Sequence, residues 1–167
     1  MNEAYVEHLV ARKPNPLTKV LKIVVIALAV LFCAIGFMTL NWYWLIPALV
    51  LGLVAYFLLP RLDVEFEYLY LDKEITIDKI FSKQTRKRAM VLDLNKMELI
   101  APITSHEFDS YTARKVPIKD YSSKNPDEKP YGIAYHDPQG DMIIIIEPNA
   151  EMLKAVKAAF PRKMIDF

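Results

Sequence analysis

Two uncharged apolar runs near the N-terminus restrict most strongly what this chain can fold into. They cover residues 23–40 and 42–59, with only Asn41 between them, and neither contains an ionisable Asp, Glu, Lys, Arg or His. As a helix rising about 1.5 Å per residue, each run spans about 27 Å, close to the hydrocarbon thickness of a bilayer. A soluble helical hairpin with this composition would have no solvent-facing side. The sequence therefore predicts two transmembrane helices joined by a short turn.

The basic residues around this hairpin predict its orientation. Lys and Arg flank it on both outer sides and are missing from the connection: Arg12, Lys13, Lys19 and Lys22 come before, and Arg61, Lys73 and Lys79 come after. By the positive-inside rule, both termini are cytoplasmic and the turn at Asn41 is external. The predicted location is the cell membrane, with two spans. Because neither span carries an ionisable residue, the hairpin is predicted to be an anchor and not an ion pathway.

The rest of the chain divides around the hairpin. We expect a cytoplasmic arm at 1–16, the transmembrane hairpin at 17–60 and a cytoplasmic domain at 61–167. In the arm, Tyr5, Val6, Leu9 and Val10 have the spacing of one helical face. That spacing predicts a short helix lying on the inner leaflet, and a poorly ordered terminus is the equal alternative.

After Arg61 the apolar period changes from that of a helix to that of a strand. Residues 63–71 alternate polar and apolar side chains, a turn at Asp72 and Lys73 follows, and residues 74–80 form a second strand. Further strands are expected at 89–94, 97–101, 131–136 and 142–147, with a doubtful one at 115–121. The four isoleucines at 143–146 suit a strand covered on both faces. Asn149 is a predicted N-cap for an amphipathic helix that ends before Pro161.

This order predicts an α+β fold: a transmembrane helical hairpin, then about seven antiparallel strands and a C-terminal amphipathic helix. It resembles a pleckstrin-homology-like (PH-like) barrel or sandwich, in which the helix closes one open end of two packed sheets. The resemblance is topological and covers about residues 63–160.

The segment 83–88 concentrates basic charge in Lys83, Arg86, Lys87 and Arg88. One hypothesis is contact with anionic lipid headgroups, worth about 1 kcal/mol per basic side chain near a membrane surface. The alternative, which we favour, is a solvated turn between strands. Nucleic acid is not an expected partner, because acidic residues balance the charge to a net +1 and no aromatic platform accompanies the basic run.

The polar stretch 103–130 holds the richest set of reactive side chains. His106, Asp109, Tyr111, Asp120 and Tyr121 form a predicted partner-binding loop. A hydrolase using His106 and nearby serines is the less favoured alternative, since no nucleophile-elbow motif frames a serine. The spacing of the histidines and of the single cysteine, Cys33, does not resemble a zinc site. We therefore expect no catalytic residue, metal or cofactor.

A closer resemblance exists at the level of sequence. The segments MNEAYVEHLV, EYLYLDKEITIDKI, the basic TRKR at 85–88, LNKMELIAPI, DYSS and EPNAEMLKAVKAAFPRK resemble a family of small two-span proteins from Gram-positive anaerobes, domain of unknown function 6106. The resemblance spans nearly the whole chain and implies no activity and no functional residues. The leading expectation is a non-enzymatic interaction module at the inner membrane face. Its expected partners are the lipid bilayer and another membrane or cytoplasmic protein.

Overall fold

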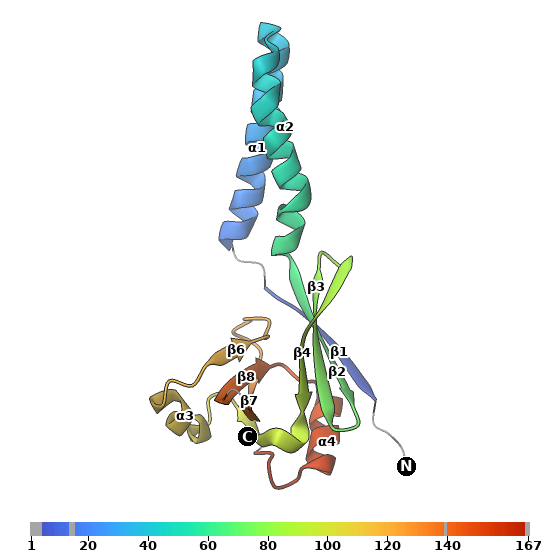
Figure 1. Cartoon of the computed structure of the whole chain (residues 1–167), viewed down its shortest axis with the longest axis vertical. Helices are drawn as coiled ribbons and strands as arrows, with labels where there is room; N and C mark the ends of the chain where they lie inside the picture. Colours follow the sequence, from blue (N-terminus) through green and yellow to red (C-terminus); the bar gives the residue numbers. More distant parts are fainter. Residues whose placement is uncertain (1–4, 14–15, 139, 166–167) are drawn as a thin grey trace. The chain divides into compact units, whose positions relative to one another are not determined.

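The computed structural model describes residues 5–13, 16–138 and 140–165. The chain divides into two compact units (Figure 1). The hairpin unit contains residues 13–64 and 81–85, and the strand unit contains residues 1–12, 65–80 and 86–167.

The hairpin unit is built from two apolar helices that pack against each other. Helix α1 (Pro16–Thr39) is followed by the short helix η1 (Trp42–Trp44), helix α2 (Leu45–Phe57) and the short helix η2 (Leu59–Leu62). Gly36 permits close packing at the turn, since a Cβ there would lie 2.9 Å from Leu45 Cδ2. The candidate spans Pro16–Thr39 and Trp42–Leu62 are long and apolar enough to cross a membrane. Within the most apolar 18-residue stretch of each span, only 6% is buried.

Sheet A has the strand order β1-β2-β3-β4 and includes the N-terminal segment. Its strands are β1 (Val6–Ala11), β2 (Val64–Leu71), β3 (Glu74–Phe81) and β4 (Thr85–Asp93). The helix expected in the arm is wrong, because β1 pairs antiparallel with β2, with Val6 opposite Tyr70 and Ala11 opposite Glu65. The buried side chains of β1, Val6 and Val10, lie on one face of a strand. Residues 1–4 and 14–15 of the predicted arm lie outside the described residues.

Sheet B has the order β5-β7-β8-β6. Its strands are β5 (Met97–Pro102), β6 (Ile118–Asp120), β7 (Tyr131–Asp137) and β8 (Gly140–Ile146). The doubtful strand at 115–121 is confirmed in its centre, but it pairs parallel with β8, so the all-antiparallel expectation is wrong. Across the described residues there are eight strands in two sheets and no closed barrel. Strand β8 has neighbours on both sides within sheet B, and its residues Ile143, Ile144 and Ile146 are buried.

Helix α4 (Ala150–Ala159) begins and ends as its sequence predicts. The Asn149 side chain accepts a hydrogen bond from the Met152 backbone N–H at 2.8 Å, and the buried residues Met152 and Val156 mark its apolar face. Helix α4 contacts β1. The chain then returns to sheet B, where the backbone of Ile100 bonds to Lys163 and Ile165. Apart from Leu94, which directly follows β4, the largest fully buried side chains come from the two sheets: Phe66, Tyr68, Ile75, Ile77, Leu92, Met97, Ile100, Ile133, Ile143, Ile144 and Ile146.

Candidate functional site

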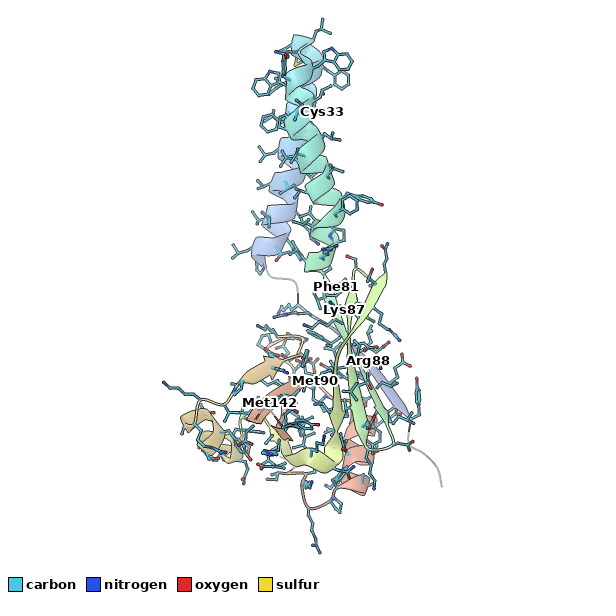
Figure 2. The ribbon with its side chains drawn as sticks, in the orientation of Figure 1. Cys33, Phe81, Lys87, Arg88, Met90 and Met142 are labelled. Atoms are coloured by element: carbon cyan, nitrogen blue, oxygen red, sulfur yellow. The ribbon has the colours of Figure 1, made fainter. Side chains whose placement is uncertain are left out.

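The basic segment does not form a simple turn, because three of its four cations lie in β4. Lys83 is in the turn between β3 and β4, whereas Arg86, Lys87 and Arg88 lie within the strand, where Figure 2 labels Lys87 and Arg88. Arg86 Nη2 lies 2.5 Å from a carboxylate oxygen of Glu67 on β2. Our expectation that strand structure begins at residue 89 is therefore wrong, because β4 begins at Thr85, beside β3 in sheet A.

Two arginines of this segment form ion pairs with nearly buried carboxylates. Glu67 is 6% exposed and Asp78 is 8% exposed. Asp78 lies 3.9 Å from Arg86 Nε and 3.7 Å from Arg88 Nε. Burial is the main factor that raises the pKa of Glu67, against the opposing charge of Arg86. Lys87 is exposed. The alternation seen in residues 63–71 was the available signal that Glu67 lies on the polar face of its strand.

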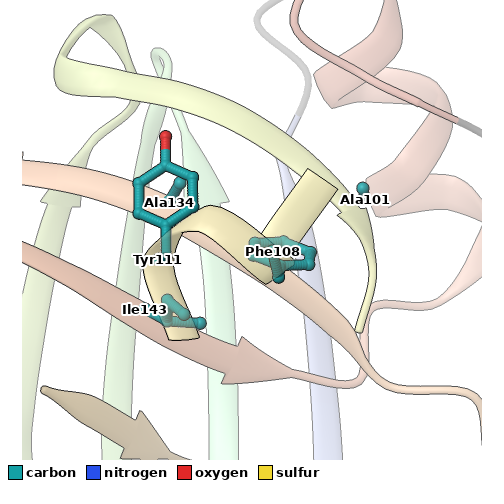
Figure 3. Packing of buried hydrophobic residues seen from close by; sticks show 5 residues of the cluster. All are labelled: Ala101, Phe108, Tyr111, Ala134 and Ile143. Atoms are coloured by element: carbon teal, nitrogen blue, oxygen red, sulfur yellow. The ribbon is translucent and has the colours of Figure 1, made fainter. Parts of the chain in front are cut away.

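The predicted partner-binding loop is largely folded structure. Residues 106–113 form the short helices η4 (His106–Phe108) and α3 (Asp109–Ala113). Figure 3 shows Phe108 and Tyr111 packed with Ala101, Ala134 and Ile143 in one buried cluster. Tyr111 is only 7% exposed, and its hydroxyl donates a hydrogen bond to Glu98. Burial, followed by the neighbouring Glu98 carboxylate, raises the pKa of Tyr111 to about 12.

His106 and Asp109 lie on the outside of this segment. Their side chains are exposed, with the imidazole Nδ1 3.2 Å from Asp109 Oδ2. The Ser105 hydroxyl accepts a hydrogen bond from the Glu107 backbone N–H at 3.4 Å, which makes it the cap of η4. Among the five predicted partner residues, these two are the ones with exposed side chains.

The other two predicted partner residues also have structural roles. Asp120 Oδ1 accepts hydrogen bonds from the backbone N–H and the hydroxyl of Ser122. Tyr121 is 7% exposed, its ring packs edge-on against Phe66, and its backbone carbonyl accepts a hydrogen bond from the Tyr68 hydroxyl at 2.6 Å. The next serine, Ser123, donates through both its backbone N–H and its hydroxyl to the buried carboxylate of Glu147. These bonds connect the segment following β6 to the core.

One polar cluster was missed by sequence reasoning. Ligand-type atoms of Glu98, His136 and Asp141 lie within 4.8 Å of one another. Asp141 is already paired with His136 at 2.7 Å and with Arg114 at 3.2 Å, and the hydrogen bond from His136 is the main factor that lowers its pKa. The guanidinium group of Arg114 would oppose a cation there. The available signal for part of this cluster was the turn-forming sequence Asp-Pro-Gln-Gly that follows His136, and the pairing of β7 with β8 places His136 opposite Asp141.

The family of the chain follows from a comparison with protein-family models. The model described as "Bacterial PH-like domain (DUF6106)" matches residues 2–166. The chain belongs to this family. The match to the bacterial PH-like family includes β1 and the hairpin as well as the strand-rich region. Searches of curated proteins and of solved structures found no match. The family description states a fold and no activity.

Proposed function

We propose that this member of the bacterial PH-like family is a membrane-anchored, non-enzymatic interaction module. The helices α1 and α2 cross the membrane, and the strand unit binds a protein partner on the cytoplasmic side. The observation that carries this proposal is the pairing of β1 with β2. These strands precede and follow the hairpin, so its two ends belong to one sheet, as an even number of spans requires.

The exposed surface of the hairpin supports the anchor. Because only 6% of the most apolar stretch within each candidate span is buried, these helices differ from the core helices of a soluble protein, whose apolar residues are covered by the fold. Trp42 and Tyr43 at the turn are about 80% exposed, as expected of rings in a membrane–water interface. Lys and Arg outside the hairpin favour a cytoplasmic strand unit.

The partner contact is assigned to His106 and Asp109, the two exposed members of the predicted loop. Ser105 caps η4, and His106 pairs with Asp109. The side chains of His106 and Asp109 are both exposed, which leaves them accessible to a partner. A loop held on a rigid sheet through buried Phe108 and Tyr111 is a common arrangement for recognition.

Cysteine labelling in intact cells tests the anchor and its orientation. In a Cys33→Ala background, we expect Asn41→Cys to react with a membrane-impermeant maleimide, and the matched Asn95→Cys to react only after permeabilisation. The reverse pattern would refute the orientation, and release of the chain by alkaline carbonate would refute the anchor.

Crosslinking in intact cells tests the partner contact. It should yield a partner adduct, and the double variant His106→Ala with Asp109→Ala should abolish that adduct. Loss of the same adduct in the control Asp127→Ala with Glu128→Ala would count against this assignment.

A further inference from the structure

A pocket of about 660 Å³ lies within the hairpin unit, where its helices meet the turn between β3 and β4. Its volume is within the range of ligand sites, about 300–1,000 Å³. One part of the pocket lining is apolar, and the other part is polar and charged. Ile26 of α1 and Ala55 and Phe57 of α2 supply an apolar part, and Phe81, labelled in Figure 2, extends it from the end of β3.

The other part of the lining is polar and charged. Its charged residues are Lys22, Arg61 and Asp63. Two cations and one anion leave the pocket with one net positive charge. Lys22 pairs with Asp63 at 2.6 Å, whereas Arg61 has no ion-pair partner among the residues that the structure describes. The pocket therefore offers a guanidinium group to an anion, and guanidinium geometry suits a phosphate.

Hydrogen-bonding side chains complete the polar part and hold its shape. Ser82, Gln84 and Thr85 line it from the β3–β4 turn. The Ser82 hydroxyl donates to the Pro60 carbonyl at 2.5 Å, and the Ser82 backbone N–H donates to the Asp63 carbonyl at 3.0 Å. Both bonds tie the turn to the segment that follows α2. Thus two hydrogen bonds hold the β3–β4 turn, which forms one wall of the pocket, against residues 60–63.

We propose that this pocket binds one anionic phospholipid, with its phosphate at Arg61 and Lys22 and the start of its acyl chains against Ile26 and Ala55. The proposal rests on the membrane anchor proposed above, because such an anchor places the apolar part of the pocket on the lipid side. A neutral soluble ligand would leave Arg61 without a counter-charge, and a free phosphate would leave the apolar wall uncovered. A phospholipid satisfies both parts with one molecule.

Native mass spectrometry of the full-length chain in detergent, titrated with phosphatidylglycerol, tests the site. We expect one saturable lipid per chain and at least tenfold weaker binding by Arg61→Gln, a change that corresponds to about 1.4 kcal/mol. The matched control Lys19→Gln also removes one positive charge. Lys19 lies on α1 about one turn before Lys22 and outside the pocket lining, so this variant should bind the lipid as the wild type does. Ala55→Trp, which fills the apolar part, should weaken binding without changing the charge.

Two comparisons identify the source of the phosphate. Phosphatidylcholine should bind more weakly than phosphatidylglycerol, and glycerol phosphate should not compete at equal concentration. Equal lipid binding by wild type, Arg61→Gln and Lys19→Gln would overturn the site, as would equally strong binding of glycerol phosphate. If the chain stays in the membrane and binding is equal, only this inference fails. If the chain is soluble, both the anchor and the lipid site fail.

Discussion

Replacing Gly132 by alanine tests whether residues 106–113 are a packed part of the fold. Gly132 lies on β7, and a Cβ there would be 2.6 Å from Phe108 Cζ and 3.0 Å from Ile103 Cδ1. Carbon atoms in contact prefer about 3.5–4.0 Å, so the overlap with the ring is about 1 Å. Phe108 is 4% exposed and packed in the buried cluster, so the ring has little room to move. We expect Gly132→Ala to lower the free energy of unfolding by about 1–3 kcal/mol.

The measurement is urea unfolding of the full-length chain in detergent, followed by far-UV circular dichroism. Tryptophan fluorescence is unsuitable, because both tryptophans, Trp42 and Trp44, lie in the hairpin unit. Gly52→Ala is the matched control, because a Cβ there meets nothing within 4 Å. In the double variant with Phe108→Leu, the smaller side chain should relieve the overlap. Its destabilisation should therefore be smaller than the sum of the two single changes by about 0.5–3 kcal/mol. A neutral Gly132→Ala, or strict additivity, would refute the packing described here.

Two further predictions concern the strand unit. Since burial raises the folded-state pKa of Glu67 above its usual 4.5, the folded state holds this proton more tightly. Stability should therefore rise as pH falls from the raised pKa toward 4.5. Glu67→Gln should remove that part of the slope in urea titrations, and an unchanged slope would contradict the assignment. Asn149→Ala should lower the free energy of unfolding by about 1 kcal/mol, because the N-cap of α4 is lost. Asn149→Ser is the control, because serine can also cap the helix. Equal stabilities of the two variants would exclude the capping role.

Local sequence signals predicted the elements whose partners are close in the chain. The alternation in residues 63–71 and the turn at Asp72 and Lys73 predicted β2 and β3, and both turn residues have positive φ as a tight hairpin requires. Asn149 predicted the start of α4. In each case the interaction that fixes the element joins residues only a few positions apart, so the local sequence is enough to predict it.

The strands β1 and β6 depend on distant partners and were harder to predict. In β1, Val6, Leu9 and Val10 fit a helical face, while Val6 and Val10 also fit a strand face, and only the pairing with β2 decides between them. Strand β6 is three residues long, and its parallel partner β8 comes much later in the chain. Periodicity contains no information about either pairing.

The candidate site shows the same limit. Tyr111 and Tyr121 read as surface residues because tyrosine is amphipathic and their neighbours are polar. Their burial arises from tertiary packing against Ile143 and Phe66. The basic charge at 86–88 was predictable, but the ion pairs of Arg86 and Arg88 with Glu67 and Asp78 required the strand register.

The pairing of β1 with β2 also has a consequence for the order of biosynthesis. Residues 6–11 are synthesised before the hairpin helices, and their hydrogen-bonding partners on β2 are made only after both helices. The other three strands of sheet A all follow the hairpin, so the sheet cannot start to form until both hairpin helices have been made. A chain whose second apolar helix failed to return would hold β1 and β2 on opposite sides of a membrane. With the membrane anchor proposed above, completion of the sheet depends on correct insertion, so folding of the strand unit would select correctly inserted chains.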